Sequence, residues 1–374
     1  MSKYFLTSES VTIGHPDKMC DYIADCILDE YLKQDRESRV ACEVVAYKNN
    51  ILVTGEITSS AVVDIEGIVR KCIKDIGYDD ETTGINYNTC EVNIKLEEQS
   101  VDIANGVDYG GAGDQGIMYG FATDETSNYM PITIVYAHKL AKRLELVRIE
   151  NIIQGLKPDG KTQVTMEFEN DIPKRVECIV ISAQHEKGIE MDKLRAEIRE
   201  KVIYEVIDSK YIDTNTKIYI NGAGRFEIGG PLADTGLTGR KIMVDTYGGI
   251  AKHGGGAFSG KDATKVDRSG AYMARYIAKN VVANHLAKKC EVQLSYVIGL
   301  KDAVAINIDC FGTESIPLDK LIQIVTNKFR ISPQEIISTL KLREPIYSKL
   351  SAYGHMGRDD LDLEWEEIIP IYEF

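Results

Sequence analysis

The chain has 374 residues, of which 44% are hydrophobic and 27% charged, as expected of a globular protein with two or three domains. Its formal net charge of −14 excludes nucleic acid as an expected partner, because binding a polyanion requires a basic face. No apolar run approaches the roughly 20 residues of a membrane helix, and the N-terminus lacks a secretory signal pattern, so we expect no membrane contact and a cytoplasmic location. The eight cysteines form no CxxC pair, which favours buried reduced thiols.

Helical periodicity alternates with pairs of strand-like runs along the whole chain. Segments with the spacing of an amphipathic helix are 16–34, 60–76, 133–147, 190–207, 268–288 and 318–329. Three strand pairs lie between them, namely 40–47 with 51–58, 162–168 with 176–183, and 291–298 with 303–309. Their expected turns are at Asn49-Asn50, near Pro173 and at Gly299.

Strands joined by one short turn pair antiparallel, which counts against a doubly wound parallel sheet. The order helix, strand, strand, helix occurs three times, so we predict an α+β fold of three similar units, each with helices on one face of a mainly antiparallel sheet. We place the three domains at 2–100, 110–229 and 230–372.

The pentapeptide GHPDK at 14–18 stands at the expected start of the first helix. Pro16 suits the first helical turn, and Asp17 would lie at a helix N-terminus, where a carboxylate is favoured and a metal–phosphate group can be held. His15 is placed to donate to a phosphate oxygen. An ordinary helix cap explains these five residues equally well.

A second motif, GGAGDQG at 110–116, precedes an apolar strand. A turn needs two glycines at most, so four glycines around Asp114 and Gln115 suggest close contact with a ligand. The polar stretch 96–108 just before it has no clear periodicity, and it is open to two interpretations, a lid over the site or a plain surface loop.

The third region, 221–269, concentrates both glycine and positive charge. Residues 222–260 hold 12 of the 31 glycines, and residues 240–268 hold six cations but only three acids. A small basic island on an acidic protein suits a compact polyphosphate better than a long nucleic acid.

Within that region, Gly255–Lys261 fits the G-x-x-x-x-G-K pattern of a P-loop. The next residue is Asp262 rather than the Ser or Thr that holds magnesium in a P-loop, and no strand of a parallel sheet precedes the motif. The P-loop interpretation is therefore weak, but phosphate binding by backbone N–H groups and Lys261 remains.

These three motifs, in this order, closely resemble those of the S-adenosylmethionine synthetases. The resemblance runs from TSESVTIGHPDK to AYGHMGR and so covers nearly the whole chain. It implies three α+β units about a pseudo-threefold axis, and an enzyme that joins ATP to the sulfur of L-methionine and then hydrolyses the tripolyphosphate to phosphate and pyrophosphate.

The resemblance also implies roles for individual residues. Catalytic roles fall on His15, Lys161, Arg240, Lys261 and Lys265. ATP contacts fall on His15, Asp159, Lys161, Arg225, Phe226, Arg240, Lys241, Ala257 and Lys261. Methionine contacts fall on Glu56, Gln99, Asp114, Asp234 and Lys265. Metal ligands would be Asp17 and Asp267 for two Mg²⁺ ions, Glu43 for K⁺ and, as a further candidate, Glu9.

The family's sites lie between two subunits, which implies a homodimer as the smallest active unit and pairing of dimers into a tetramer. One departure is the short connection before the second motif, where only Tyr109 separates Asp108 from Gly110. Two rivals remain, a P-loop ATPase or kinase and a non-enzymatic scaffold or regulatory subunit.

Overall fold

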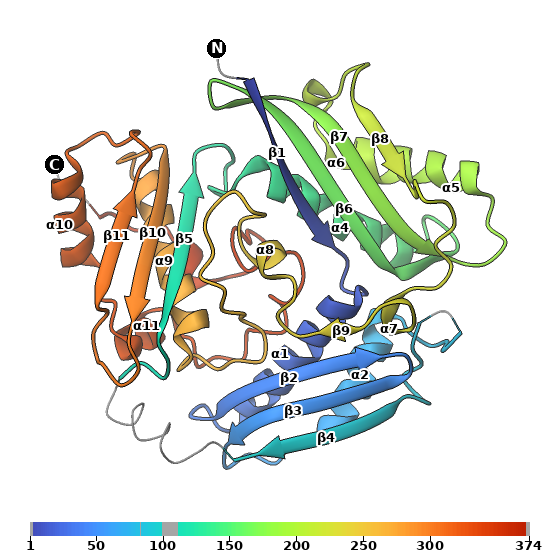
Figure 1. Ribbon diagram of the computed structural model, residues 1–374, viewed down its shortest axis with the longest axis horizontal. Helices are drawn as coiled ribbons and strands as arrows, with labels where there is room; N and C mark the ends of the chain where they lie inside the picture. The colour runs from blue at the N-terminus through green and yellow to red at the C-terminus, as the bar shows by residue number, and fades with distance from the viewer. Residues whose placement is uncertain (1–2, 83, 99–110, 372–374) are drawn as a thin grey trace.

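The computed structural model describes residues 3–82, 84–98 and 111–371, which form three β-sheets with helices packed on one face of each (Figure 1). The prediction of three helix-and-sheet units is therefore confirmed. Alternation along strand β2 (Arg39–Tyr47) shows why each sheet has two different faces. Val40, Cys42, Val44 and Ala46 are buried under the helices, whereas the residues between them lie on the open face.

The first sheet has the strand order β4-β3-β2-β9. Its other strands are β3 (Asn50–Thr58), β4 (Glu91–Glu97) and β9 (Gly236–Leu237), and its helices are α1 (Pro16–Gln34) and α2 (Ile65–Ile76). Strand β2 pairs antiparallel with β3 and with β9, whereas β4 runs parallel to β3.

The second sheet has the order β1-β6-β7-β8. Its strands are β1 (Lys3–Val11), β6 (Leu156–Glu169), β7 (Ile172–His185) and β8 (Lys217–Ile220). Its helices are α4 (Ile132–Ile149), α5 (Met191–Ile198) and α6 (Tyr204–Val206), the last two joined by a π-helical turn at Arg199–Ile203. A short 3₁₀ turn follows at Ser209–Tyr211.

The third sheet has the order β11-β10-β5. Its strands are β5 (Gly116–Thr123), β10 (Lys289–Tyr296) and β11 (Ala305–Asp309). Its helices are α9 (Val266–Ala283), α10 (Leu318–Lys328) and α11 (Pro333–Thr339). Two one-turn helices, α7 (Gly230–Ala233) and α8 (Ile242–Asp245), lie in the glycine-rich region, and a 3₁₀ turn at Glu364–Glu366 lies near the C-terminus.

Each unit begins with a strand that joins the sheet of another unit. Strand β1 pairs antiparallel with β6, β5 pairs antiparallel with β10, and β9 pairs antiparallel with β2. The exchange is cyclic, because the first unit gives its strand to the second, the second to the third, and the third to the first. Helices α1, α4 and α9 each contact both the received strand and its neighbour, which extends the threefold relation to the helices.

Several boundaries differ from those expected. The turn between β2 and β3 is Lys48-Asn49, one residue earlier than predicted, with Lys48 at a positive φ of 53°. Pro173 lies inside β7, because the preceding turn is at Asn170-Asp171. The helix predicted to end at 288 ends at Ala283. Among the described residues, no helix is long and apolar enough to cross a membrane.

Candidate active site

The GHPDK motif forms the N-terminus of α1, as predicted. His15 is the N-cap residue, and its Nδ1 accepts the backbone N–H of Asp17 at 3.2 Å. Burial, together with the charges of nearby lysines and Arg240, lowers the pKa of His15 to about 2, so the imidazole is neutral. Since Nδ1 accepts, the proton is on Nε2, which leaves His15 a hydrogen-bond donor without charge.

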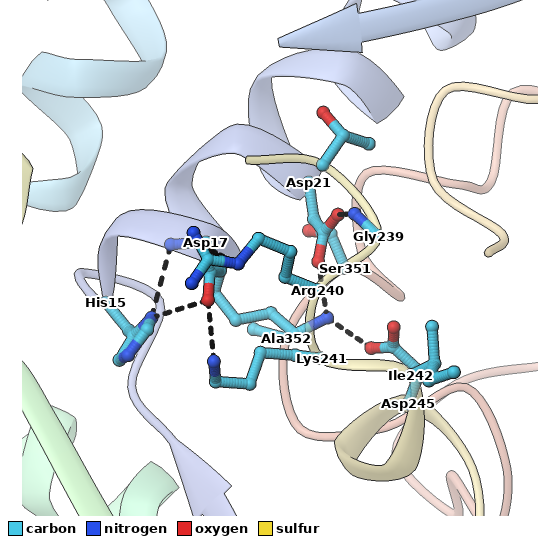
Figure 2. Close-up of polar contacts among 12 residues, drawn as sticks. His15, Asp17, Asp21, Gly239, Arg240, Lys241, Ile242, Asp245, Ser351 and Ala352 are labelled. Carbon is cyan, nitrogen blue, oxygen red and sulfur yellow. Dashed lines mark hydrogen bonds and ion pairs between the residues drawn. The ribbon is translucent and has the colours of Figure 1, made fainter. Parts of the chain in front are cut away.

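Asp17 lies in the first turn of the same helix and contacts two cations of the third region (Figure 2). Its Oδ2 accepts from Lys241 Nζ at 2.6 Å, and its Oδ1 lies 3.7 Å from Arg240 Nε and accepts the backbone N–H of Leu237 at 3.0 Å. The segment around 237–241 is thus bound to the first helix across more than 200 residues of sequence.

The 158–161 segment of β6 packs against the GHPDK turn. A side chain at Gly14 would place its Cβ 2.3 Å from the carbonyl oxygen of Pro158, so only glycine permits this approach. Lys161 is close enough to lower the pKa of His15, and Asp159 lies in the same stretch. The structure therefore brings His15, Asp17, Lys161, Arg240 and Lys241 together.

Asp159 is buried, and burial raises its pKa to about 6. Its Oδ2 accepts the backbone N–H of Gly230 at 2.8 Å, but its Oδ1 has no hydrogen-bond partner in the part of the chain that the structure describes. A buried acceptor without a donor costs stability, and a ligand hydroxyl or amino group would satisfy it.

Arg225 and Phe226 belong to the segment that leads from β8 to this site. The backbone of Phe226 is bound twice to His185, through its N–H to Nε2 at 3.0 Å and through its carbonyl to the His185 N–H at 2.9 Å. Arg225 is exposed and pairs with Glu227 at 3.0 Å. Gly230, four residues after Phe226, donates its backbone N–H to Asp159.

A second cluster occupies the N-terminus of α9. Lys261 Nζ donates to Asp267 Oδ2 at 2.7 Å, and Asp267 lies in the first turn of the helix, as Asp17 does in α1. A Cβ at Gly256 would lie 2.2 Å from Asp267 Oδ1, so a glycine is required there. Lys265, the N-cap residue of α9, is paired with Asp262 at 2.5 Å.

Asp262 explains why the P-loop pattern is broken. Its Oδ2 accepts the backbone N–H of Val40 at 2.8 Å, and its own N–H donates to the Val40 carbonyl. The residue that follows Lys261 therefore holds the third region against β2, instead of binding a metal as the Ser or Thr of a P-loop does.

The two clusters adjoin within one chain. A Cβ at Gly239, beside Arg240, would come within 2.6 Å of the Cβ of Ala257, which follows Gly256. The Asp17–Lys241 pair and the Asp267–Lys261 pair are thus linked by a direct contact between the two loops that carry the lysines.

The remaining candidates lie around these clusters. Glu43 and Glu56 are on the open face of β2 and on β3, and partial desolvation by neighbouring groups raises the pKa of Glu43 while Lys261 opposes the rise. Asp114 is exposed two residues before Gly116, whose Cβ position lies 3.5 Å from Asp267 Oδ1.

Two further candidates, Glu9 and Asp234, are exposed. Glu9 is on β1 opposite Gln163, and Asp234 follows α7 close enough to Asp159 to raise its pKa. Gln99 and most of the proposed lid lie outside the described residues.

Three family models match successive parts of the chain. They are the N-terminal domain of S-adenosylmethionine synthetase over 3–101, the central domain over 109–226 and the C-terminal domain over 228–367. The chain belongs to the S-adenosylmethionine synthetase family. It is 52% identical to the S-adenosylmethionine synthase of Finegoldia magna, over 98% of this chain and 97% of that one. It is 51% identical to the enzyme of the same name from Clostridium botulinum, over 99% and 98%.

The magnesium ions expected of an S-adenosylmethionine synthetase can be tested against these residues. Within the described ranges, no group of three or more His, Cys, Asp or Glu side chains could hold a metal alone. Mg²⁺ at nucleotide sites usually takes one or two carboxylates and completes its shell with phosphate oxygens and water. Asp17 and Asp267 fit this pattern, because each is a single carboxylate beside lysines that attract phosphate.

A set of buried aspartates in α1 was not predicted from the sequence. Asp21, Asp25 and Asp29 follow Asp17 at intervals of four residues, and all four lie between 0% and 4% exposed. The signal was present in the sequence as a period of four, which places side chains on one stripe of a helix.

Proposed function

We propose that this chain transfers the adenosyl group of ATP to the sulfur of L-methionine and then hydrolyses the released tripolyphosphate to phosphate and pyrophosphate. The observation that carries the proposal is the apposition of two aspartate–lysine pairs, Asp17 with Lys241 and Asp267 with Lys261, each at a helix N-terminus. Such ends bind phosphate through backbone N–H groups and the helix dipole, and the lysines add charge.

The chemistry requires no general base. A lone pair of the methionine sulfur forms the bond to the ribose C5′, and the bond from C5′ to the phosphate oxygen breaks with its electrons. No proton is lost, because the thioether becomes a sulfonium. Catalysis therefore rests on aligning sulfur with the leaving oxygen and on stabilising the negative charge that grows on the tripolyphosphate.

The residues of both clusters suit that task. The neutral His15 can donate from Nε2 to a phosphate oxygen at any pH near neutrality, and Lys161, Arg240, Lys241 and Lys261 supply positive charge. The unsatisfied Oδ1 of Asp159 would accept from a hydroxyl or amino group of the nucleoside.

The other proposed contacts follow the family resemblance. Arg225, Phe226 and Ala257 would complete the nucleotide pocket, and Glu56, Gln99, Asp114, Asp234 and Lys265 would bind methionine.

Two Mg²⁺ ions would be held by Asp17 and Asp267 together with phosphate oxygens, with Glu9 as a further candidate. When bound, they would neutralise phosphate charge. A K⁺ ion at Glu43 is supported by the neighbouring Glu56, since two carboxylates within electrostatic range favour a cation.

We further propose a homodimer with shared sites, paired into a tetramer and located in the cytoplasm. The dimer is supported by large apolar side chains on the open faces of the sheets, about half exposed, at Phe5, Tyr47, Ile117 and Tyr219. Mixing two inactive variants, Asp17→Asn and Asp267→Asn, tests the shared site. If Asp17 of one subunit works with Asp267 of its partner, each hybrid dimer contains one intact site and regains activity. If both aspartates of a site come from the same chain, the mixture stays inactive.

The function is tested by incubating the purified chain with ATP and Mg²⁺, with and without methionine. Phosphate release that depends on methionine, with formation of a sulfonium product, supports the proposal. ATP hydrolysis without methionine would support the ATPase alternative, and absence of any turnover the regulatory one.

A further inference from the structure

The buried aspartates of α1 bind backbone N–H groups between residues 237 and 348. Asp17 accepts from Leu237 N–H, Asp21 from Gly239 N–H at 2.9 Å and Asp25 from Gly260 N–H at 2.8 Å. One turn further, Asp29 accepts from the N–H groups of Tyr347 and Ser348 at 2.9 and 2.8 Å. One helix stripe therefore holds both cation-bearing loops and also a separate C-terminal segment.

Asp21 follows Asp17 by one turn on this stripe and lies beside the Gly239–Lys241 segment (Figure 2). Its Oδ1 accepts from Gly239, and its Oδ2 accepts from Lys18 Nζ at 2.8 Å. Lys18 is fully buried and also donates to Asp245, at the end of α8. One buried lysine and two carboxylates thus hold the segment 239–245 at both ends.

Gly239 is constrained from its other side as well. Its φ is +78°, and a Cβ there would come within 2.6 Å of the Cβ of Ala257. Arg240 and Lys241 follow directly, so their positions relative to Asp17 depend on where Gly239 is held.

We propose that Asp21 is a positioning residue of the adenosyl-transfer reaction, which fixes Arg240 and Lys241 through its bond to Gly239. The inference rests on the proposed function. It assigns catalytic importance to a side chain that touches neither substrate nor metal. A displacement of about 1 Å in groups that stabilise a transition state can cost about 100-fold in rate.

The test compares Asp21→Asn with Asp29→Asn. An asparagine has one acceptor oxygen, whereas each of these carboxylates receives two donors, so either substitution breaks one contact. The two sites share the helix, the burial and a bond to a backbone N–H of a distant segment, although Asp21 also receives Lys18 Nζ. They differ in what they hold, because Asp29 binds the 347–348 segment and not a loop that carries site cations.

We expect Asp21→Asn to lower kcat roughly 10- to 100-fold with the KM for methionine within about twofold of wild type. The Asp29 variant should lose stability, measured by denaturant midpoint, but keep kcat within about twofold. Both are assayed at a temperature at which the midpoints show them to be folded. Gly239→Ala displaces the same segment without touching the buried charges and should reproduce the kinetic effect of Asp21→Asn.

Three results would overturn the inference: an unchanged kcat in folded Asp21→Asn, an equal loss of kcat in the Asp29 variant, or an unchanged kcat in Gly239→Ala. If Asp21→Asn does not fold, Gly239→Ala decides. A wild-type chain without methionine-dependent activity would reject the proposed function instead.

Discussion

Replacing Asp159 by asparagine should stabilise the ligand-free protein while weakening its hold on ATP. The wild-type carboxyl is 6% exposed, and burial raises its pKa from 3.8 to about 6. A shift of about two units, at about 1.4 kcal/mol each, means that ionised Asp159 destabilises the folded state by up to about 3 kcal/mol. Asparagine keeps an oxygen for the Gly230 N–H and removes the charge.

The sign of the pH dependence follows from the same shift. Because the folded-state pKa is raised, the folded protein binds the proton more tightly than the unfolded chain, so the contribution is favourable at low pH and is lost as pH rises through about 6. The variant should therefore be more stable than wild type by about 2–3 kcal/mol at about pH 8, and the difference should vanish near pH 4.

The measurement is urea unfolding of both proteins without ligand, at equal protein concentration and at several pH values between about 4 and 8. A variant less stable than wild type at the higher pH, or a difference that does not change with pH, would refute the reasoning. The same variant should show a raised KM for ATP, because the unsatisfied Oδ1 acceptor is replaced or moved.

Three further outcomes are expected of the site. Lys261→Ala should lower kcat by roughly 10²–10³, the usual effect of losing one preorganised charge-stabilising donor, and an unaltered rate of sulfonium formation would remove Lys261 from the mechanism. Because the pKa of His15 is lowered to about 2, its titration should not contribute to the pH profile of kcat/KM. An inflection near pH 6.5 in the wild type that is lost in His15→Asn would contradict this. In Gly256→Ala, the new methyl group would meet Asp267 Oδ1, so we expect a roughly 10-fold or larger rise in the Mg²⁺ concentration needed for half-maximal activity, whereas normal Mg²⁺ dependence would argue against a metal at that carboxylate.

Local patterns predicted most of the fold. The helix at 16–34 and the strand pair at 40–47 and 51–58 were located within a residue or two, because burial on one side produces clear periods of 3.6 and 2. The strands that were not predicted are β1, β4, β8 and β9. Strand β9 has only two residues, and β4 and β8 pair in parallel with distant neighbours, so nothing in their local sequence identifies their partners.

The site was predictable in its parts but not in its assembly. Motif spacing and family resemblance pointed to His15, Asp17 and Lys261, yet Asp17 is held by Arg240 and Lys241, more than 200 residues away. The bond from Asp21 to Gly239 is of this kind, since neither residue belongs to a recognised motif and only the packing of α1 against the glycine-rich region brings them together.

The cyclic exchange of strands has a consequence for biogenesis. During synthesis, β1 has no partner until β6 is made about 150 residues later. Strand β2 likewise waits for β9, which is made about 190 residues after β2. Until then the nascent chain exposes unpaired strand edges, which are prone to intermolecular pairing. A fragment cut between units would lack a strand that its sheet requires, so the polypeptide should resist dissection into separately expressed pieces and should mature only when translation has passed all three.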